Sequence, residues 1–251
     1  MDGTGRRSDG TYQAEELTAC RGGRWSKLDA VKFALLHSPL VGPTTWRWVA
    51  SALVADGHDV AVPDLRDAAV RGQPGGVIDA AIAALRSGWS APVLVAHSGA
   101  GPMLPLIAAR LPAQPQMVFI DAGLPPCEGA ASPGGDFLDQ LRALAVDGVL
   151  PKWSTWWGEG VMETLVPDAD RRWAVEADLP EVPVAFFESA IDVPEGWCDT
   201  PGAFVLLSES YRGDAERART MGWRTVERLG SHLDIVSHAD EIARTIVDLT
   251  R

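Results

Sequence analysis

The sequence predicts an α/β protein in which a mainly parallel sheet carries helices on both faces. Short apolar runs alternate with segments of helical periodicity, an order typical of parallel strands joined by crossover helices. The runs are continuous rather than alternating with polar residues, as in strands buried on both faces. The chain has 251 residues, 46% apolar and 22% charged, which is enough for one such core with an insertion.

Regular patterning starts after residue 29. Residues 1–29 are rich in Gly, Arg, Ser and Thr without clear periodicity, and we expect a flexible N-terminal extension there. Residues 31–36 are apolar and predict a buried strand. After a loop, Thr44 or Thr45 can cap a helix that Gly57 ends.

Further strands and helices follow before the insertion. Residues 77–86 carry apolar side chains at helical spacing on one face. A helix is expected over 99–111, with Pro102 tolerated in its first turn and Pro105 expected to kink or delay it. Short apolar runs predict further strands at 60–62, 93–96 and 117–120.

The alternation stops near residue 124 and resumes after residue 196. The stretch between contains paired prolines, paired glycines and helix-like pieces such as 137–146. We therefore expect a helical cap over 124–196, inserted into a core of 30–123 and 197–251. After it, strands are expected at 204–207 and 224–229, and helices at 214–221 and 238–249.

The end of the third apolar run carries an A-x-S-x-A motif. The strand leads straight into a tight turn with Ser98 at its apex, and a helix follows. Such a turn strains the serine backbone and lifts its hydroxyl above the sheet, and it needs small neighbours, here Ala96 and Ala100. Gly99 N–H, at the helix N-terminus, is a candidate donor to an oxyanion. The alternative is an ordinary strand–helix turn.

The loop after the first strand can supply the second oxyanion donor. Leu40 N–H is the first candidate and Ser38 N–H the alternative, because Pro39 has no N–H. His37 is a candidate for contact with substrate, and holding the loop in place is an equally good interpretation.

The general base is expected late in the chain. His232 follows the last strand after a glycine turn, where a loop histidine can reach a serine hydroxyl at the carboxyl edge of the sheet. The rival His238 starts the last helix, where capping is the simpler interpretation. His58 and His97 are placed less well.

The acid that would orient the imidazole has several candidates. Asp121 ends the fourth strand, with a turn-forming role as its alternative. Glu209 is the carboxylate nearest the end of the strand after the insertion, and Asp214 more simply begins a helix.

Tryptophans cluster in the insertion. Trp153, Trp156 and Trp157 could share one helical face, with Trp173 and Trp197 nearby. They predict an aromatic pocket for an apolar or aromatic group; the alternative is packing of the cap against the core.

Charge and cysteine content narrow the partners. A net charge of −12 argues against nucleic acid and anionic membranes as partners. Cys20, Cys127 and Cys198 are scattered, so we expect unpaired thiols in a reducing cytoplasm. No apolar run follows the basic residues near the start, so no secretory signal is expected. A small-molecule substrate is expected, with no metal and no organic cofactor.

Four segments together resemble the α/β-hydrolase family. They are the loop 37–43 with Trp46 after it, Pro63-Asp64-Leu65, the elbow 96–101, and Ser231-His232-Leu233 before a final helix. They span residues 31 to 249, and the order Ser then His is that of the family. Two features depart from it. An Asp after the penultimate strand is absent, and little room before residue 31 leaves open a sheet shortened by two strands.

The resemblance implies a serine hydrolase acting through an acyl-enzyme on an ester or thioester of a small, apolar or aromatic molecule. Two alternatives stay open. A lyase or cyclase could use the same Ser–His pair without a covalent intermediate, and a non-catalytic binder could retain the pocket.

Overall fold

The structure, a computed structural model, describes residues 30–85, 88–89, 91–132 and 134–251. The extension predicted at 1–29 lies outside these residues. Within them, six strands form one parallel sheet in the order β10-β9-β4-β3-β1-β2. Their bounds are β1 Lys32–Leu36, β2 Asp59–Ala61, β3 Val93–Ser98, β4 Met117–Ala122, β9 Gly202–Leu206 and β10 Arg224–Glu227.

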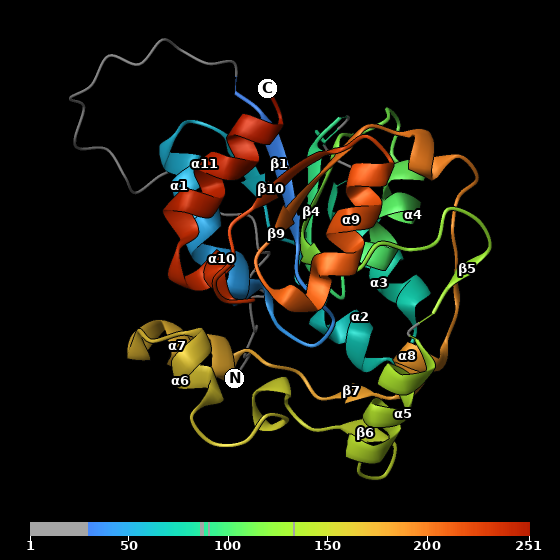
Figure 1. The fold of residues 1–251 in the computed structure, drawn as a ribbon, viewed down its shortest axis with the longest axis vertical. Coiled ribbons are helices and arrows are strands. Elements are labelled where there is room, and N and C mark those ends of the chain that lie inside the picture. The colour runs from blue at the N-terminus through green and yellow to red at the C-terminus, as the bar shows by residue number, and fades with distance from the viewer. Residues whose placement is uncertain (1–29, 86–87, 90, 133) are drawn as a thin grey trace, which may run out of the picture.

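Helices cover both faces of this sheet, as the continuous apolar runs predict (Figure 1). In β1, Phe33 and Leu35 pack into the core on one face, and Ala34 and Leu36 pack into the core on the other, because successive side chains of a strand alternate. The helices on the first face are α1 Arg47–Ala55, α10 Asp234–Ser237 and α11 Ala239–Leu249. Those on the second are α2 Arg66–Val70, α3 Pro74–Leu85, α4 Leu104–Ala109 and α9 Arg212–Thr220. No helix in the described part of the chain is both long enough and apolar enough to span a membrane.

A 3-10 turn precedes each of two helices, α4 and α1. Pro105 lies in the first turn of α4, and a 3-10 turn, Gly101–Met103, precedes that helix, so the proline delays the helix as expected. Thr45 does not cap α1. Its hydroxyl donates a 2.8 Å hydrogen bond to the carbonyl of Gly42, and a 3-10 turn, Pro43–Trp46, comes before Arg47.

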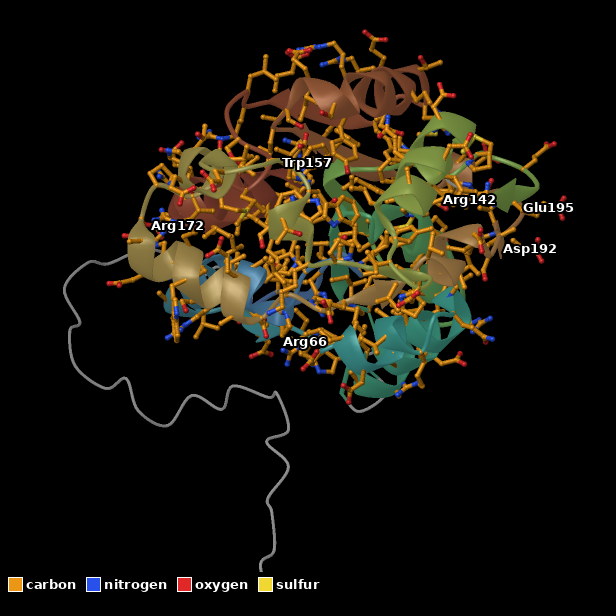
Figure 2. All side chains as sticks on the ribbon, turned by 90° about the horizontal axis from the view of Figure 1, so that it is seen from below. Arg66, Arg142, Trp157, Arg172, Asp192 and Glu195 are labelled. Atoms are coloured by element: carbon orange, nitrogen blue, oxygen red, sulfur yellow. A yellow bond between two sulfur atoms is a disulfide. The ribbon has the colours of Figure 1, made fainter. Side chains whose placement is uncertain are left out.

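Most of the segment predicted as an insertion, residues 124–196 (the inserted segment), lies at one end of the sheet, below it in Figure 1. The same end faces the viewer in Figure 2, where Arg142, Trp157 and Arg172 of this segment are labelled. Besides the predicted helices it contains two short antiparallel ladders, β5 with β8 and β6 with β7. Its elements are β5 Ala130–Ala131, α5 Gly135–Leu144, β6 Val149–Leu150, α6 Val161–Leu165, α7 Ala169–Ala177, β7 Val182–Pro183, α8 Ala185–Glu188 and β8 Ile191–Asp192.

A disulfide joins Cys127 to Cys198, so the prediction of three unpaired thiols is wrong. The two residues lie 71 apart in sequence, without the short spacing that marks a disulfide motif, and only the fold brings them together. One lies just inside the inserted segment and the other just beyond its end. The bond therefore closes the base of the insertion.

Candidate active site

Ser98 is the last residue of β3 and adopts a left-handed backbone with φ of 55°. This region is rare for residues other than glycine, and strain of this kind is typical of a nucleophile held at a sharp turn. The pairing of β3 with β4 shifts its register between His97 and Ser98. The backbone thus leaves the sheet at Ser98 and presents the side chain above the strand end.

The turn is kept tight by a glycine that the A-x-S-x-A interpretation left out. A Cβ on Gly101 would lie 2.2 Å from the carbonyl oxygen of Gly123, a distance no real side chain tolerates. Ala100 is buried beside it. The closest backbone approach is therefore three positions after Ser98 rather than two.

The two predicted oxyanion donors, Gly99 and Leu40, belong to two segments that lie against each other. A Cβ on Gly99 would be 3.0 Å from Ser38 Oγ and 3.4 Å from Pro39 Cδ, so the elbow abuts this loop. Leu40 N–H makes only a long hydrogen bond, 3.4 Å, to Ser38 Oγ. Among the described residues, Gly99 N–H has no backbone acceptor.

His37 is buried and has no free polar atom. Leu65 N–H donates to its Nε2 at 2.9 Å, so the ring proton is on Nδ1, which donates to Ser38 carbonyl oxygen at 2.9 Å. Burial keeps the pKa of His37 below its usual value, and hydrogen bonding to Ser38 offsets only part of this effect. The structure gives no support to the predicted contact of His37 with substrate, because both ring nitrogens are hydrogen-bonded to backbone groups that hold the loop.

An aspartate lies beside the predicted base. His232 Nδ1 is 2.7 Å from Asp121 Oδ2, so Nε2 is the ring nitrogen turned away from the carboxylate. The Asp121 side chain is fully buried and that of His232 is 17% exposed. A carboxylate in this position fixes the tautomer and ring orientation and stabilises the imidazolium.

Asp121 is held by the loop that follows β9. Its Oδ1 accepts hydrogen bonds from Leu207 N–H at 2.8 Å and Ser208 N–H at 2.9 Å, and its Oδ2 accepts one from Ser208 Oγ at 2.5 Å. Burial alone would raise the pKa of Asp121, but the hydrogen bonds from His232, Ser208 and Leu207 outweigh burial and the pKa lies below its usual value. The carboxylate is therefore ionised beside the imidazole.

The other two candidate acids lie elsewhere. Glu209 is on the surface, where both its oxygens pair with Arg212. Asp214 lies in the first turn of α9 and accepts a hydrogen bond from Leu124 N–H at 2.9 Å. Of the carboxylates considered from the sequence, the structure brings Asp121 to His232. The rival histidine, His238, pairs with Asp234 instead.

His97 lies under the base. Its Nε2 donates to the backbone carbonyl of His232 at 2.9 Å, and the two ring centroids are 4.4 Å apart. Its Nδ1 is buried and has no partner among the described residues. Burial and the proximity of His232 lower the pKa of His97 to about 3, so this ring is neutral at physiological pH.

A small cavity joins these groups. Ser98, His97 and His232 line it together with Leu40 and Trp153, and Ser38, Val41 and Leu233 complete the lining. Its volume is about 20 Å³, room for roughly one water molecule. A bound molecule larger than water therefore extends beyond this cavity or displaces part of its lining.

The predicted tryptophans are placed unequally. Trp153 lies in a 3-10 turn, Trp153–Thr155, with its ring centroid 6.3 Å from that of His232. Trp156 donates to Pro151 carbonyl oxygen and packs against the core, and Trp157 is 52% exposed. They do not share one helical face, because the helix predicted there is a single turn. Trp173 is exposed and Trp197 is buried in the core.

Asp178 connects the inserted segment to α2 by an ion pair and to the 3-10 turn after β1 by a hydrogen bond. Asp178, just after α7, accepts a 2.9 Å hydrogen bond from Thr44 N–H and pairs with Arg66, which also binds Asp64. A Cβ on Gly42 would lie 2.1 Å from the carboxylate of Asp178. Only glycine lets the loop approach this side chain so closely.

Two site residues escaped the sequence interpretation. Ser208 binds Asp121, and Tyr211 OH lies 3.1 Å from Ser98 Oγ. Among the described residues, Ser98 Oγ makes no other hydrogen bond. The weak signal for both was their place, in the short polar loop after β9 that also holds Glu209, one of the candidate acids.

No protein-family model matches the sequence, and no curated protein matches it. Solved structures do match. An extracellular α/β-hydrolase from a Paenibacillus species, described as sharing structural and functional homology with tobacco salicylic acid binding protein 2, is 17% identical with a TM-score of 0.69, covering 87% of this chain and 98% of that one. Polyneuridine aldehyde esterase is 16% identical with a TM-score of 0.70, covering 89% of this chain and all of the other.

Tomato methylketone synthase I, solved in complex with 2-tridecanone, is a further match at 15% identity and a TM-score of 0.68, covering 89% of this chain and 98% of that one. At identities this low, shared architecture does not carry activity with it. The likenesses establish the predicted fold, and the chemistry has to be argued from the residues of the site.

Proposed function

We propose that this chain, which has the α/β-hydrolase fold, is a serine hydrolase that cleaves an ester or thioester of a small, apolar or aromatic molecule through an acyl-enzyme. The observation that carries the proposal is the strained Ser98 in one cavity with an imidazole oriented by a buried carboxylate, 2.7 Å away. These are the parts that nucleophilic acyl transfer requires.

In the proposed reaction, Ser98 Oγ attacks the carbonyl carbon and its proton passes to His232 Nε2. Asp121 stabilises the imidazolium that forms. Gly99 N–H and Leu40 N–H bind the oxyanion; a donor of this kind contributes about 3–4 kcal/mol to lowering the barrier. The imidazolium then protonates the leaving group, and a water activated by His232 hydrolyses the acyl-enzyme.

Ser98 Oγ is hydrogen-bonded to the hydroxyl of Tyr211 rather than to His232 in this structure. This does not oppose the proposal, because catalytic hydrogen bonds are often unformed without substrate and tighten in the Michaelis complex. The apolar lining by Leu40, Trp153 and Leu233 supports an apolar or aromatic substrate. The inserted segment, 124–196, is proposed as the cap that carries this specificity.

The disulfide supports an oxidising compartment over the cytoplasmic location predicted from the sequence, because disulfides are rare in the reducing cytosol. Measuring free thiols in protein taken directly from the source cell, without reductant, tests this point.

A fluorophosphonate probe tests the hydrolase proposal. Wild type is expected to be labelled, and Ser98→Ala and His232→Ala to lose labelling almost completely. Labelling that persists in Ser98→Ala contradicts the assignment of the nucleophile. Wild type that folds and is never labelled favours a non-catalytic binder.

A second candidate uses Ser98 and His232 for acid–base chemistry without a covalent intermediate, as a lyase or cyclase. The hydrogen bond between Ser98 and the neutral phenol of Tyr211 supports this candidate, because it places a second hydroxyl at the reacting position. Product analysis separates the two, since hydrolysis consumes water and yields an acid together with an alcohol or thiol.

A further inference from the structure

Tyr211 touches the proposed nucleophile. It ends the 3-10 turn Glu209–Tyr211 after β9, and its hydroxyl oxygen is 3.1 Å from Ser98 Oγ although the residues are 113 apart in sequence. Neither the motif around Ser98 nor the mechanism above uses this side chain.

The same tyrosine also stacks on the proposed base. Its ring centroid is 5.3 Å from that of His232 and the two planes differ by 10°. Tyr211 N–H donates to the carbonyl oxygen of Ser208 at 3.2 Å, and Ser208 binds Asp121 through both N–H and hydroxyl. One short loop thus contacts the acid, the base and the nucleophile.

The Tyr211 hydroxyl keeps its proton in the folded protein. Burial raises the pKa of Tyr211 to about 12, and the hydrogen bond with Ser98 opposes this only in part. A serine hydroxyl has one proton to donate and two lone pairs to accept with. Ser98 can therefore accept a hydrogen bond from Tyr211 and still have its own proton available for transfer to His232 in a substrate complex.

We propose that Tyr211 is a further catalytic residue, whose O–H donates a hydrogen bond to Ser98 Oγ and stabilises the negative charge that develops there. The charge on Oγ grows as its proton passes to His232 Nε2, and it moves to the carbonyl oxygen as the bond from Oγ to the carbonyl carbon forms. It grows again when that bond breaks in deacylation. No proton leaves Tyr211 in either step. This inference rests on the hydrolase proposal and adds a donor to it.

Tyr211→Phe is a selective test, because phenylalanine retains the ring that stacks on His232 and removes only the hydroxyl. A hydrogen bond to a charged group corresponds to a factor of about 10 to 100 in rate. We expect that decrease in kcat and in the second-order rate constant for fluorophosphonate labelling of Ser98, with KM and melting temperature little changed. A purely structural role would move the melting temperature instead.

The sequence offers a matched control, since it holds only two tyrosines, Tyr12 and Tyr211. Tyr12→Phe is expected to react like wild type. In that background Tyr211 is the sole tyrosine, so growth on mono- or difluorotyrosine changes the acidity of this one phenol. We expect the labelling rate at neutral pH to rise with phenol acidity, because a more acidic phenol is the stronger donor.

The outcomes are distinguishable. If wild type is labelled and Tyr211→Phe is labelled within twofold of it, Tyr211 is not catalytic and the hydrolase proposal survives. A labelling rate that does not respond to fluorination leads to the same conclusion. If folded wild type is not labelled at all, both proposals fall.

Discussion

Asp121 and His232 lie 111 residues apart in the sequence and 2.7 Å apart in the structure, measured from Oδ2 to Nδ1. Asp121 comes from the end of β4, so the carboxylate reaches the imidazole from a strand next to the nucleophile strand. The loop after β9, where the family usually has its acid, supplies hydrogen-bond donors to that carboxylate instead. The carboxylate thus lies at the end of β4, and its hydrogen-bond donors, Leu207 and Ser208, lie after β9.

Asp121→Asn tests this arrangement. The amide cannot hold the imidazole in the same tautomer or stabilise its charge, so we expect kcat to fall by about four orders of magnitude with the fold retained. Glu209→Gln is the control and is expected to leave steady-state kinetics unchanged, because Glu209 pairs with Arg212 at the surface. Similar losses in both variants would show that Asp121 has no special role.

His97 predicts how stability depends on pH. Its pKa is about 3 in the folded protein against 6.5 for an ordinary histidine. Between these values the unfolded chain binds a proton that folded His97 rejects, so the free energy of unfolding falls as pH is lowered from 6.5. The contribution of one such group is at most about 1.4 kcal/mol per pH unit.

Urea unfolding between pH 4 and pH 7 measures this slope. His97→Gln retains a side-chain N–H donor and removes the titrating group. The slope of the unfolding free energy against pH is therefore expected to fall by an amount that corresponds to about one proton. His37, whose pKa is also lowered, maintains a slope in the variant. An unchanged slope in His97→Gln would mean that His97 is charged in the folded state or that its burial has no effect on its proton.

The Cys127–Cys198 bond predicts sensitivity to reductant. A cross-link that closes a loop of this length stabilises a folded protein by about 2–4 kcal/mol, mainly by restricting the unfolded chain. We expect the melting temperature to fall on reduction, and the double variant Cys127→Ser, Cys198→Ser to have the lower value with or without reductant. A double variant that still responds to reductant would place the effect elsewhere.

Trp153 predicts substrate preference. It is the tryptophan that lines the cavity with Ser98, so Trp153→Ala is expected to raise KM for aryl esters by about tenfold, equivalent to about 1.4 kcal/mol of lost contact. Trp157→Ala removes an exposed ring from the same segment and is expected to leave KM unchanged. Kinetics on paired aryl and short alkyl esters measure the difference, and equal KM values for wild type and Trp153→Ala would remove Trp153 from the substrate site.

The parallel sheet was within reach of the sequence because most of its strands are local apolar runs, and the turn at Ser98 because it is local as well; the order of the strands was not predicted. The partner of His232 was left open, since Asp121 at the end of β4 and Glu209 just after β9 both lie near strand ends and only packing decides which one is near. The contact of Tyr211 with Ser98 and the disulfide were not predicted, for the same reason. Each joins segments that no local pattern connects, and the inserted segment in between has no simple periodicity.

The central claim is that Ser98 carries an acyl group during turnover. Acid-quenching wild type during the first turnover of an activated aryl ester, followed by intact mass measurement and peptide mapping, tests it directly. We predict a mass increase equal to the acyl group, located on Ser98 and absent in Ser98→Ala. Turnover that depends on Ser98 without any adduct, or an adduct on another residue, would contradict the account.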